Sequence, residues 1–115
     1  MMKKNVVQEK SYAFALKIIA LSKQLNKQSH YVISHQLLKS GTSIGANIEE
    51  ALAGQSRADF LSKMSIASKE ARETGYWLRL LRDSGDIDKE RSSTYLKEID
   101  ELIRLLTSIV KTTRS

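Results

Sequence analysis

The chain contains two histidines and no cysteine, so His30 and His35 are the first residues to consider as ligands of a metal ion. Two ligands on one helix must lie three or four residues apart to share a face, and these two lie five apart. Neither histidine belongs to a Glu-x-x-His pair, the unit that binds iron inside helical bundles. We therefore expect no metal and no cofactor, and we assign both histidines to turns or to the surface.

Residues 40–51 form a glycine-containing segment, SGTSIGANIEEA, whose glycines raise the question of a phosphate-binding loop. Such a loop ends in Gly-Lys followed by Ser or Thr, and this segment lacks that ending. Serines are numerous, yet none has a histidine and a carboxylate in a recognisable catalytic signature. The residues that could do chemistry argue against an enzyme, and we expect a protein that acts by binding.

The same segment continues a helix, because apolar residues keep one helical face from Ile33 to Leu52. An interior glycine costs about 1 kcal/mol of helix stability relative to alanine, so the two glycines require a reason. We interpret the segment as a place where another helix approaches closely and where polar side chains hydrogen-bond nearby groups. Its close-packing residues are Gly41, Ser43, Gly45, Ala46 and Asn47.

Basic side chains form two stripes in the second half of the chain. Arg72, Tyr76 and Arg79 lie four and three residues apart, so a helix places an aromatic ring between two guanidinium groups. The second stripe repeats every seven residues and consists of Lys97, Arg104 and Lys111. Cations that project from one side can contact successive phosphates of a nucleic acid. In the alternative interpretation they solvate an outer face, pair with carboxylates such as Asp100 and Glu101, or pack on the tyrosine.

Three further apolar residues, Ile66, Trp77 and Leu80, lie beside the main apolar face of the same helical segment. They give this helix more apolar surface than one packing contact requires, which predicts a subunit interface. Homo-oligomerisation would bury them and would repeat the basic stripes around a symmetry axis. The alternative is that Trp77 closes the end of the monomer's own core.

Four helices must position these side chains, and we expect them at about residues 6–25, 30–53, 56–83 and 87–111. The chain has no proline and only 5 glycines among 115 residues, a composition that favours an all-α protein. Long helices joined by short turns predict an antiparallel, up-down-up-down four-helix bundle, with residues 1–115 forming one domain.

Apolar periodicity predicts which faces form the core. The third helix repeats apolar or small residues at alternating spacings of four and three, and the fourth follows the same pattern. In the first helix the stripe is wide and includes Tyr12, Phe14, Leu16, Ile18, Ile19, Leu21 and Leu25. The expected core faces of the last two helices are Phe60, Met64, Ala67, Ala71, Thr74, Leu78 and Leu81, then Tyr95, Ile99, Leu102, Leu106 and Ile109.

The formal net charge is +6 and the isoelectric point is near 9.7, values that favour association with polyanions without proving it. No segment resembles a signal peptide or a membrane span, since residues 1–10 are polar and Lys17 interrupts the longest apolar run of the first helix. We therefore expect a cytoplasmic protein that does not bind membranes.

Two motifs give the chain a family resemblance. Residues 36–51 read QLLKSGTSIGANIEEA, and residues 69–74 and 76–81 read KEARET and YWLRLL. With these motifs the chain resembles the four-helix bundle proteins encoded in intervening sequences of bacterial large-subunit ribosomal RNA genes. The resemblance covers nearly the whole chain. It departs at Gly45, where many members have proline, and at Gly75, where relatives often carry glutamate.

The resemblance implies a four-helix bundle without catalytic residues that tends to form ring-like homopentamers. A related branch, the accessory variability determinant of diversity-generating retroelements, binds nucleic acid and a reverse transcriptase. Together with the basic stripes, this predicts a non-enzymatic homo-oligomer that binds ribosomal RNA or other structured RNA or DNA. The resemblance implies that the oligomer is a pentamer. The alternative from another class is an adaptor that docks a partner enzyme such as a reverse transcriptase.

Overall fold

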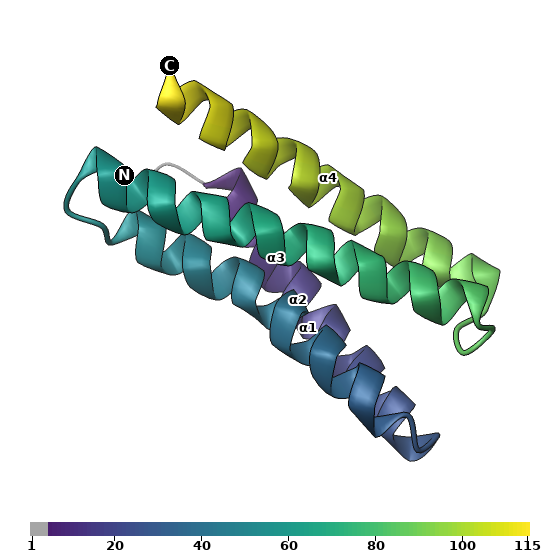
Figure 1. Cartoon of the computed structure of the whole chain (residues 1–115). Coiled ribbons are helices and arrows are strands. Elements are labelled where there is room, and N and C mark those ends of the chain that lie inside the picture. Colours follow the sequence, from purple (N-terminus) through teal and green to yellow (C-terminus); the bar gives the residue numbers. More distant parts are fainter. Residues whose placement is uncertain (1–4) are drawn as a thin grey trace.

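The computed structural model describes residues 5–115 and contains four long helices (Figure 1). These are α1 (Val6–Lys27), α2 (Tyr31–Leu52), α3 (Arg57–Asp83) and α4 (Lys89–Arg114). The predicted helices match them within about three residues at every end, and residues 1–4 of the predicted domain lie outside the described part. The protein is all-α over this range, as the composition indicated.

Three of the four helices begin at a side chain that caps the first turn. The Asn5 side chain accepts a hydrogen bond from the backbone N–H of Gln8 at 3.0 Å, and Ser56 accepts one from Asp59 at 3.0 Å. Asp88 does the same at the start of α4. Each cap satisfies a backbone donor that has no partner inside the helix, which sets the residue where the helix starts.

Two of the turns end a helix with a residue in the left-handed conformation. Ser29 has φ 64° and Gly85 has φ 83°, and each is followed by a backbone N–H that bonds back to the last turn of the preceding helix. This is the arrangement in which a left-handed residue satisfies the otherwise unpaired carbonyl groups of a helix end. Glycine adopts it without strain, as at Gly85, whereas Ser29 holds it at some cost.

Polar contacts between helices show that every neighbouring pair is antiparallel. In each pair of helices, the contact that lies further along one helix lies nearer the start of the other. The contacts are Ser22–Ser34 and Gln8–Glu49 for α1 and α2, Ser40–Thr74 and Glu50–Lys63 for α2 and α3, Arg72–Thr107 and Arg57–Thr113 for α3 and α4, and Lys10–Glu101 and Gln24–Arg91 for α4 and α1. The chain therefore forms the up-down-up-down bundle that was predicted.

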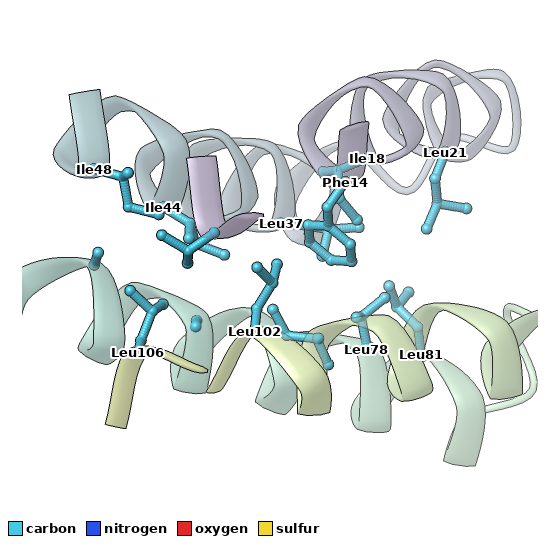
Figure 2. Packing of buried hydrophobic residues seen from close by; sticks show 14 of the residues in the cluster. Phe14, Ile18, Leu21, Leu37, Ile44, Ile48, Leu78, Leu81, Leu102 and Leu106 are labelled. Atoms are coloured by element: carbon cyan, nitrogen blue, oxygen red, sulfur yellow. The ribbon is translucent and has the colours of Figure 1, made fainter. Parts of the chain in front are cut away.

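The core lies between a layer of α1 and α2 and a layer of α3 and α4. Figure 2 shows Phe14, Ile18 and Leu37 pointing from the first layer toward Leu78 and Leu102 in the second. The side chains of the predicted α3 face are fully buried except for Phe60, which is partly exposed. Their alternating spacing of four and three predicted this, because it keeps one stripe along nearly antiparallel neighbours.

In α1, three of the seven residues of the predicted stripe turn away from the core. Phe14 and Ile18 are buried, whereas Tyr12, Leu16 and Ile19 are exposed by 66%, 53% and 36%. The expectation that all of these residues pack in the core was wrong for these three. Because they lie four and three residues apart, they form one continuous apolar surface, which we call the α1 outer surface.

The glycine segment of α2 is helical, and its two glycines differ. A Cβ at Gly41 would lie 2.8 Å from Ile18 Cγ2 in α1, so the absence of a side chain at this position lets the two helices approach closely. At Gly45 the nearest side-chain atom, Ser11 Oγ, would lie at 3.4 Å, an ordinary contact. Ala46 is exposed and takes no part in this packing, contrary to expectation.

The two polar residues of the segment bond to the backbone of their own helix. Ser43 Oγ donates to the Lys39 carbonyl at 2.6 Å, and Asn47 Nδ2 donates to the Ser43 carbonyl at 2.8 Å. Such bonds satisfy polar side chains without a partner from another helix. The segment is therefore a structural element, and the binding surface must be sought elsewhere.

Candidate nucleic-acid interface

A groove runs along the outside of the bundle between α3 and α4. Its larger hollow has a volume of about 790 Å³. The residues that line it are Arg72, Gly75, Arg79, Arg82, Lys89, Ser93, Leu96, Lys97, Ile99, Asp100 and Ile103. A smaller hollow of about 350 Å³ is lined by Ser65, Ser68, Lys69, Arg72, Thr107, Val110, Lys111 and Arg114. Arg72 lines both hollows, so we describe them together as the α3/α4 groove.

The α3/α4 groove is strongly basic. In the described part of the chain, eight cationic residues and one acidic residue line its two hollows. This excess of positive charge exceeds the net charge of +6 of the whole chain, so the remaining surface is close to neutral or slightly acidic. A groove lined by one sign of charge concentrates counter-ions of the opposite sign.

Four cations of the larger hollow have no carboxylate partner. Within residues 5–115, the side chains of Arg72, Arg79, Lys89 and Lys97 make no ion pair. Arg72 donates to the Thr107 hydroxyl at 3.3 Å, and Arg79 lies over the Tyr76 ring, with its Cζ 5.8 Å from the ring centroid. Both guanidinium groups keep further donors available for an anion.

Cations between α1 and α4 behave differently. Lys10 pairs with Glu101 at 2.8 Å, and Lys17 pairs with Glu98 at 2.6 Å. Pairing with nearby carboxylates therefore accounts for the cations on this side of the bundle. In the α3/α4 groove, Arg79 packs on Tyr76, as the alternative interpretation also allows, but pairing with carboxylates does not account for the four unpaired cations of the larger hollow.

The register of α3 explains how the groove is built. Arg72, Gly75, Arg79 and Arg82 lie three, four and three residues apart, so they form one line beside the core face. Gly75 is buried in the floor of the larger hollow, between the two unpaired arginines. The sequence prediction took Tyr76 as the middle of this stripe, but Tyr76 does not line the groove.

Two carboxylates limit the positive charge of the groove. Arg82 donates to Asp83 at 2.8 Å, and this hydrogen bond lowers the pKa of the Asp83 carboxyl below its ordinary value. Asp83 therefore stays ionised and offsets much of the charge of Arg82. Asp100 lines the larger hollow and pairs with Arg104, four residues later on the same helix.

The predicted α4 stripe is divided by this pairing. Lys97 and Lys111 line the groove, one in each hollow, as the prediction requires. Arg104 lines neither hollow of the groove, and its guanidinium group is engaged by Asp100. Sequence reasoning also missed Lys69, Arg82, Lys89 and Arg114. The spacing of Arg72, Arg79 and Arg82 along one helical line could have identified Arg82. Whether Lys69, Lys89 and Arg114 line the groove depends on how α4 lies against α3.

The residues predicted to form a subunit interface lie on the side of α3 away from the α3/α4 groove, and we call them the α3 flank. Ile66 and Leu80 are exposed by 38% and 39%. Trp77 is partly buried and packs against the core, and its ring contacts Tyr76 edge-on with centroids 5.4 Å apart. Its Nε1 is buried and has no hydrogen-bond partner among the described residues. Trp77 thus covers the edge of the monomer's own core, and only its neighbours remain well exposed.

Neither histidine lies in the groove. His30 precedes α2, and its Nε2 lies 3.3 Å from Asp86 Oδ1 in the turn before α4, while His35 is exposed on α2. Within residues 5–115, no group of three or more His, Asp or Glu side chains is placed to hold a metal ion. None of the four described helices is long and apolar enough to span a membrane.

The fold and the groove define an all-α, antiparallel four-helix bundle with one basic face. Residues 3–108 match the family model of the 23S rRNA-intervening sequence proteins, and the chain therefore belongs to this family. A solved structure of an S23 ribosomal protein family member of unknown function, from Bacteroides thetaiotaomicron, is 51% identical, with a TM-score of 0.90. The similarity covers 96% of this chain and 99% of that one. No curated protein matches the chain.

Proposed function

We propose that this protein is a non-enzymatic, homo-oligomeric bundle that binds nucleic acid in the cytoplasm without a cofactor. Its ligand is ribosomal RNA or another structured RNA or DNA. The link of its family to 23S rRNA genes favours ribosomal RNA. The observation that carries the proposal is the concentration of unpaired cations in the α3/α4 groove. Phosphates supply the complementary charge in a regular series, which isolated carboxylates do not.

A binding titration at several salt concentrations tests this proposal. If the four unpaired cations of the larger hollow each contact one phosphate, the logarithm of the binding constant should fall linearly with the logarithm of the salt concentration, with a slope of about −3 to −4. Fluorescence anisotropy with labelled fragments of the host 23S rRNA measures the binding constant at each salt concentration and therefore the slope. Affinity that does not change with salt, or no binding at low salt, would contradict the proposal.

Two separate apolar surfaces support self-association. The α1 outer surface and the α3 flank lie on different helices, so contact between them joins unlike surfaces of two subunits. Such head-to-tail contacts form a closed ring when the rotation between subunits closes, which agrees with the homopentamer that the family resemblance implies. A ring would also repeat the α3/α4 groove once in each subunit and strengthen binding to a long polyanion.

Leu16→Glu tests this self-association without disturbing the core, because Leu16 is 53% exposed. We expect the variant to dissociate into smaller species, since an interface cannot bury an unpaired carboxylate without a large cost. Light scattering at a fixed protein concentration measures the size. Lys27→Glu, at the exposed end of α1, is the control and should leave the size unchanged. A Leu16→Glu variant that keeps the size of the original protein would exclude the α1 outer surface.

The exposed α1 outer surface also favours a second function, an adaptor that docks a partner enzyme such as a reverse transcriptase. Apolar surface that is left exposed often marks a site of protein interaction. The same variant distinguishes the two functions. Unchanged size together with loss of the partner enzyme from pull-down experiments would assign Leu16 to an adaptor surface.

A further inference from the structure

The floor of the larger hollow is apolar, although its rim is basic. Leu96, Ile99 and Ile103 of α4 lie opposite Gly75 of α3. A Cβ at Gly75 would lie 3.8 Å from Ile99 Cγ2 and 3.9 Å from Ile103 Cδ1, which are ordinary van der Waals contacts, so a methyl group fits at this position but a longer side chain has to extend into the hollow. The absence of a long side chain at this position leaves the floor of the hollow open.

Phosphate groups alone do not explain such a floor. Phosphate recognition uses charged and polar donors, whereas the flat face of a base gains binding energy on apolar and aromatic side chains. The hollow of about 790 Å³ is within the size range of sites that enclose small organic groups, so it has room for a nucleobase.

The width of the groove restricts what can enter it. Packed helices have axes about 8–10 Å apart, so a groove between two of them admits a single strand. A duplex keeps its bases stacked inside and presents only its backbones, so it can contact the rim but not the floor.

We infer that the α3/α4 groove binds an unpaired stretch of nucleic acid, with one base against the Gly75 floor and the adjoining phosphates on Arg72, Arg79 and Lys97. The inference rests on the proposed function and narrows its ligand to loops, bulges or single strands. Unpaired RNA is also where bases are free to leave their stacks. Gly75 then determines specificity, because it provides the space for the base.

Substitutions at Gly75 test this inference. Gly75→Leu should fill the hollow and weaken binding of a labelled single-stranded RNA roughly 10-fold, the contribution of one stacked base, while binding of the matching duplex changes little. Gly75→Ala is the matched control. Its methyl group makes only ordinary contacts, so we expect single-strand affinity within about 3-fold of the original. The original protein should prefer the single strand, as fluorescence anisotropy at one salt concentration measures.

Other outcomes separate this inference from the proposed function. Equal or tighter binding of the duplex, or unchanged single-strand binding by Gly75→Leu, would overturn the base site and leave groove binding of phosphates intact. Inorganic polyphosphate that displaces the RNA equally well from the original and Gly75→Leu proteins would overturn it too. Absence of binding to both RNA and DNA, single-stranded and duplex, would reject the proposed function itself. Thermal unfolding checks that Gly75→Leu is folded, and Gly75→Gln, with a more flexible side chain, replaces it if it is not.

Discussion

Reversing two charges in the α3/α4 groove with Arg72→Glu and Arg79→Glu should lower the affinity for RNA by about 100-fold or more at moderate salt. The two arginines are exposed, make no ion pair among the described residues, and lie on either side of Gly75. Their replacement removes two phosphate contacts and places two negative charges beside the nucleic acid. The salt dependence should also become shallower by about two units of slope.

The control for this variant carries the same change in net charge elsewhere. Lys23→Glu and Lys27→Glu reverse two exposed lysines of α1, which line neither hollow of the groove. If binding depends on the groove, the control keeps most of its affinity. Equal losses in both variants would show that only the overall charge matters, and circular dichroism confirms that both remain folded.

Gly41→Ala should destabilise the protein, whereas Gly45→Ala should not. At Gly41 the new Cβ would meet Ile18 at 2.8–3.3 Å, and overpacking costs about 1–3 kcal/mol, only partly offset by the better helix propensity of alanine. We expect a net loss of up to about 2 kcal/mol. At Gly45 the contacts are ordinary, so the propensity gain of up to about 1 kcal/mol remains.

Urea unfolding at one protein concentration measures these differences, and a double-mutant cycle assigns their cause. In an Ile18→Ala background the clash is absent, so Gly41→Ala should become neutral or stabilising. The coupling energy between the two positions should therefore exceed about 1 kcal/mol. A cost of Gly41→Ala that stays the same in both backgrounds would mean that the contact with Ile18 does not require glycine.

Much of the fold could be predicted because it depends on local patterns. The alternating spacing in α3 identified Met64, Ala67 and Leu78 as core residues, and Asn5 and Ser56 start their helices as capping side chains should. Periodicity could not predict how the wide stripe of α1 divides. A pattern defines a face relative to its own helix, and only the position of α2 and α4 determines that Tyr12 and Leu16 stay outside.

The candidate site was only partly predictable for a related reason. Arg72, Arg79, Lys97 and Lys111 were identified by spacing and do line the groove. Arg104 fits the same seven-residue pattern, but the Asp100 carboxylate, one turn earlier on the helix, engages its guanidinium group. In the sequence, Gly75 stands out only as a position where relatives often carry glutamate. Its role in opening the groove becomes evident only when Ile99 and Ile103 are placed opposite.

The way the first and last helices meet has a consequence for the order of folding. Of the four packed helix pairs, α1 and α4 make the least contact, and exposed ion pairs such as Lys10–Glu101 and Lys17–Glu98 join them. The other three pairs are consecutive hairpins, whose contacts close short loops and form early. The bundle can thus assemble hairpin by hairpin, and we expect the meeting of α1 with α4 to be the final step of folding and the first to reverse when the native state opens.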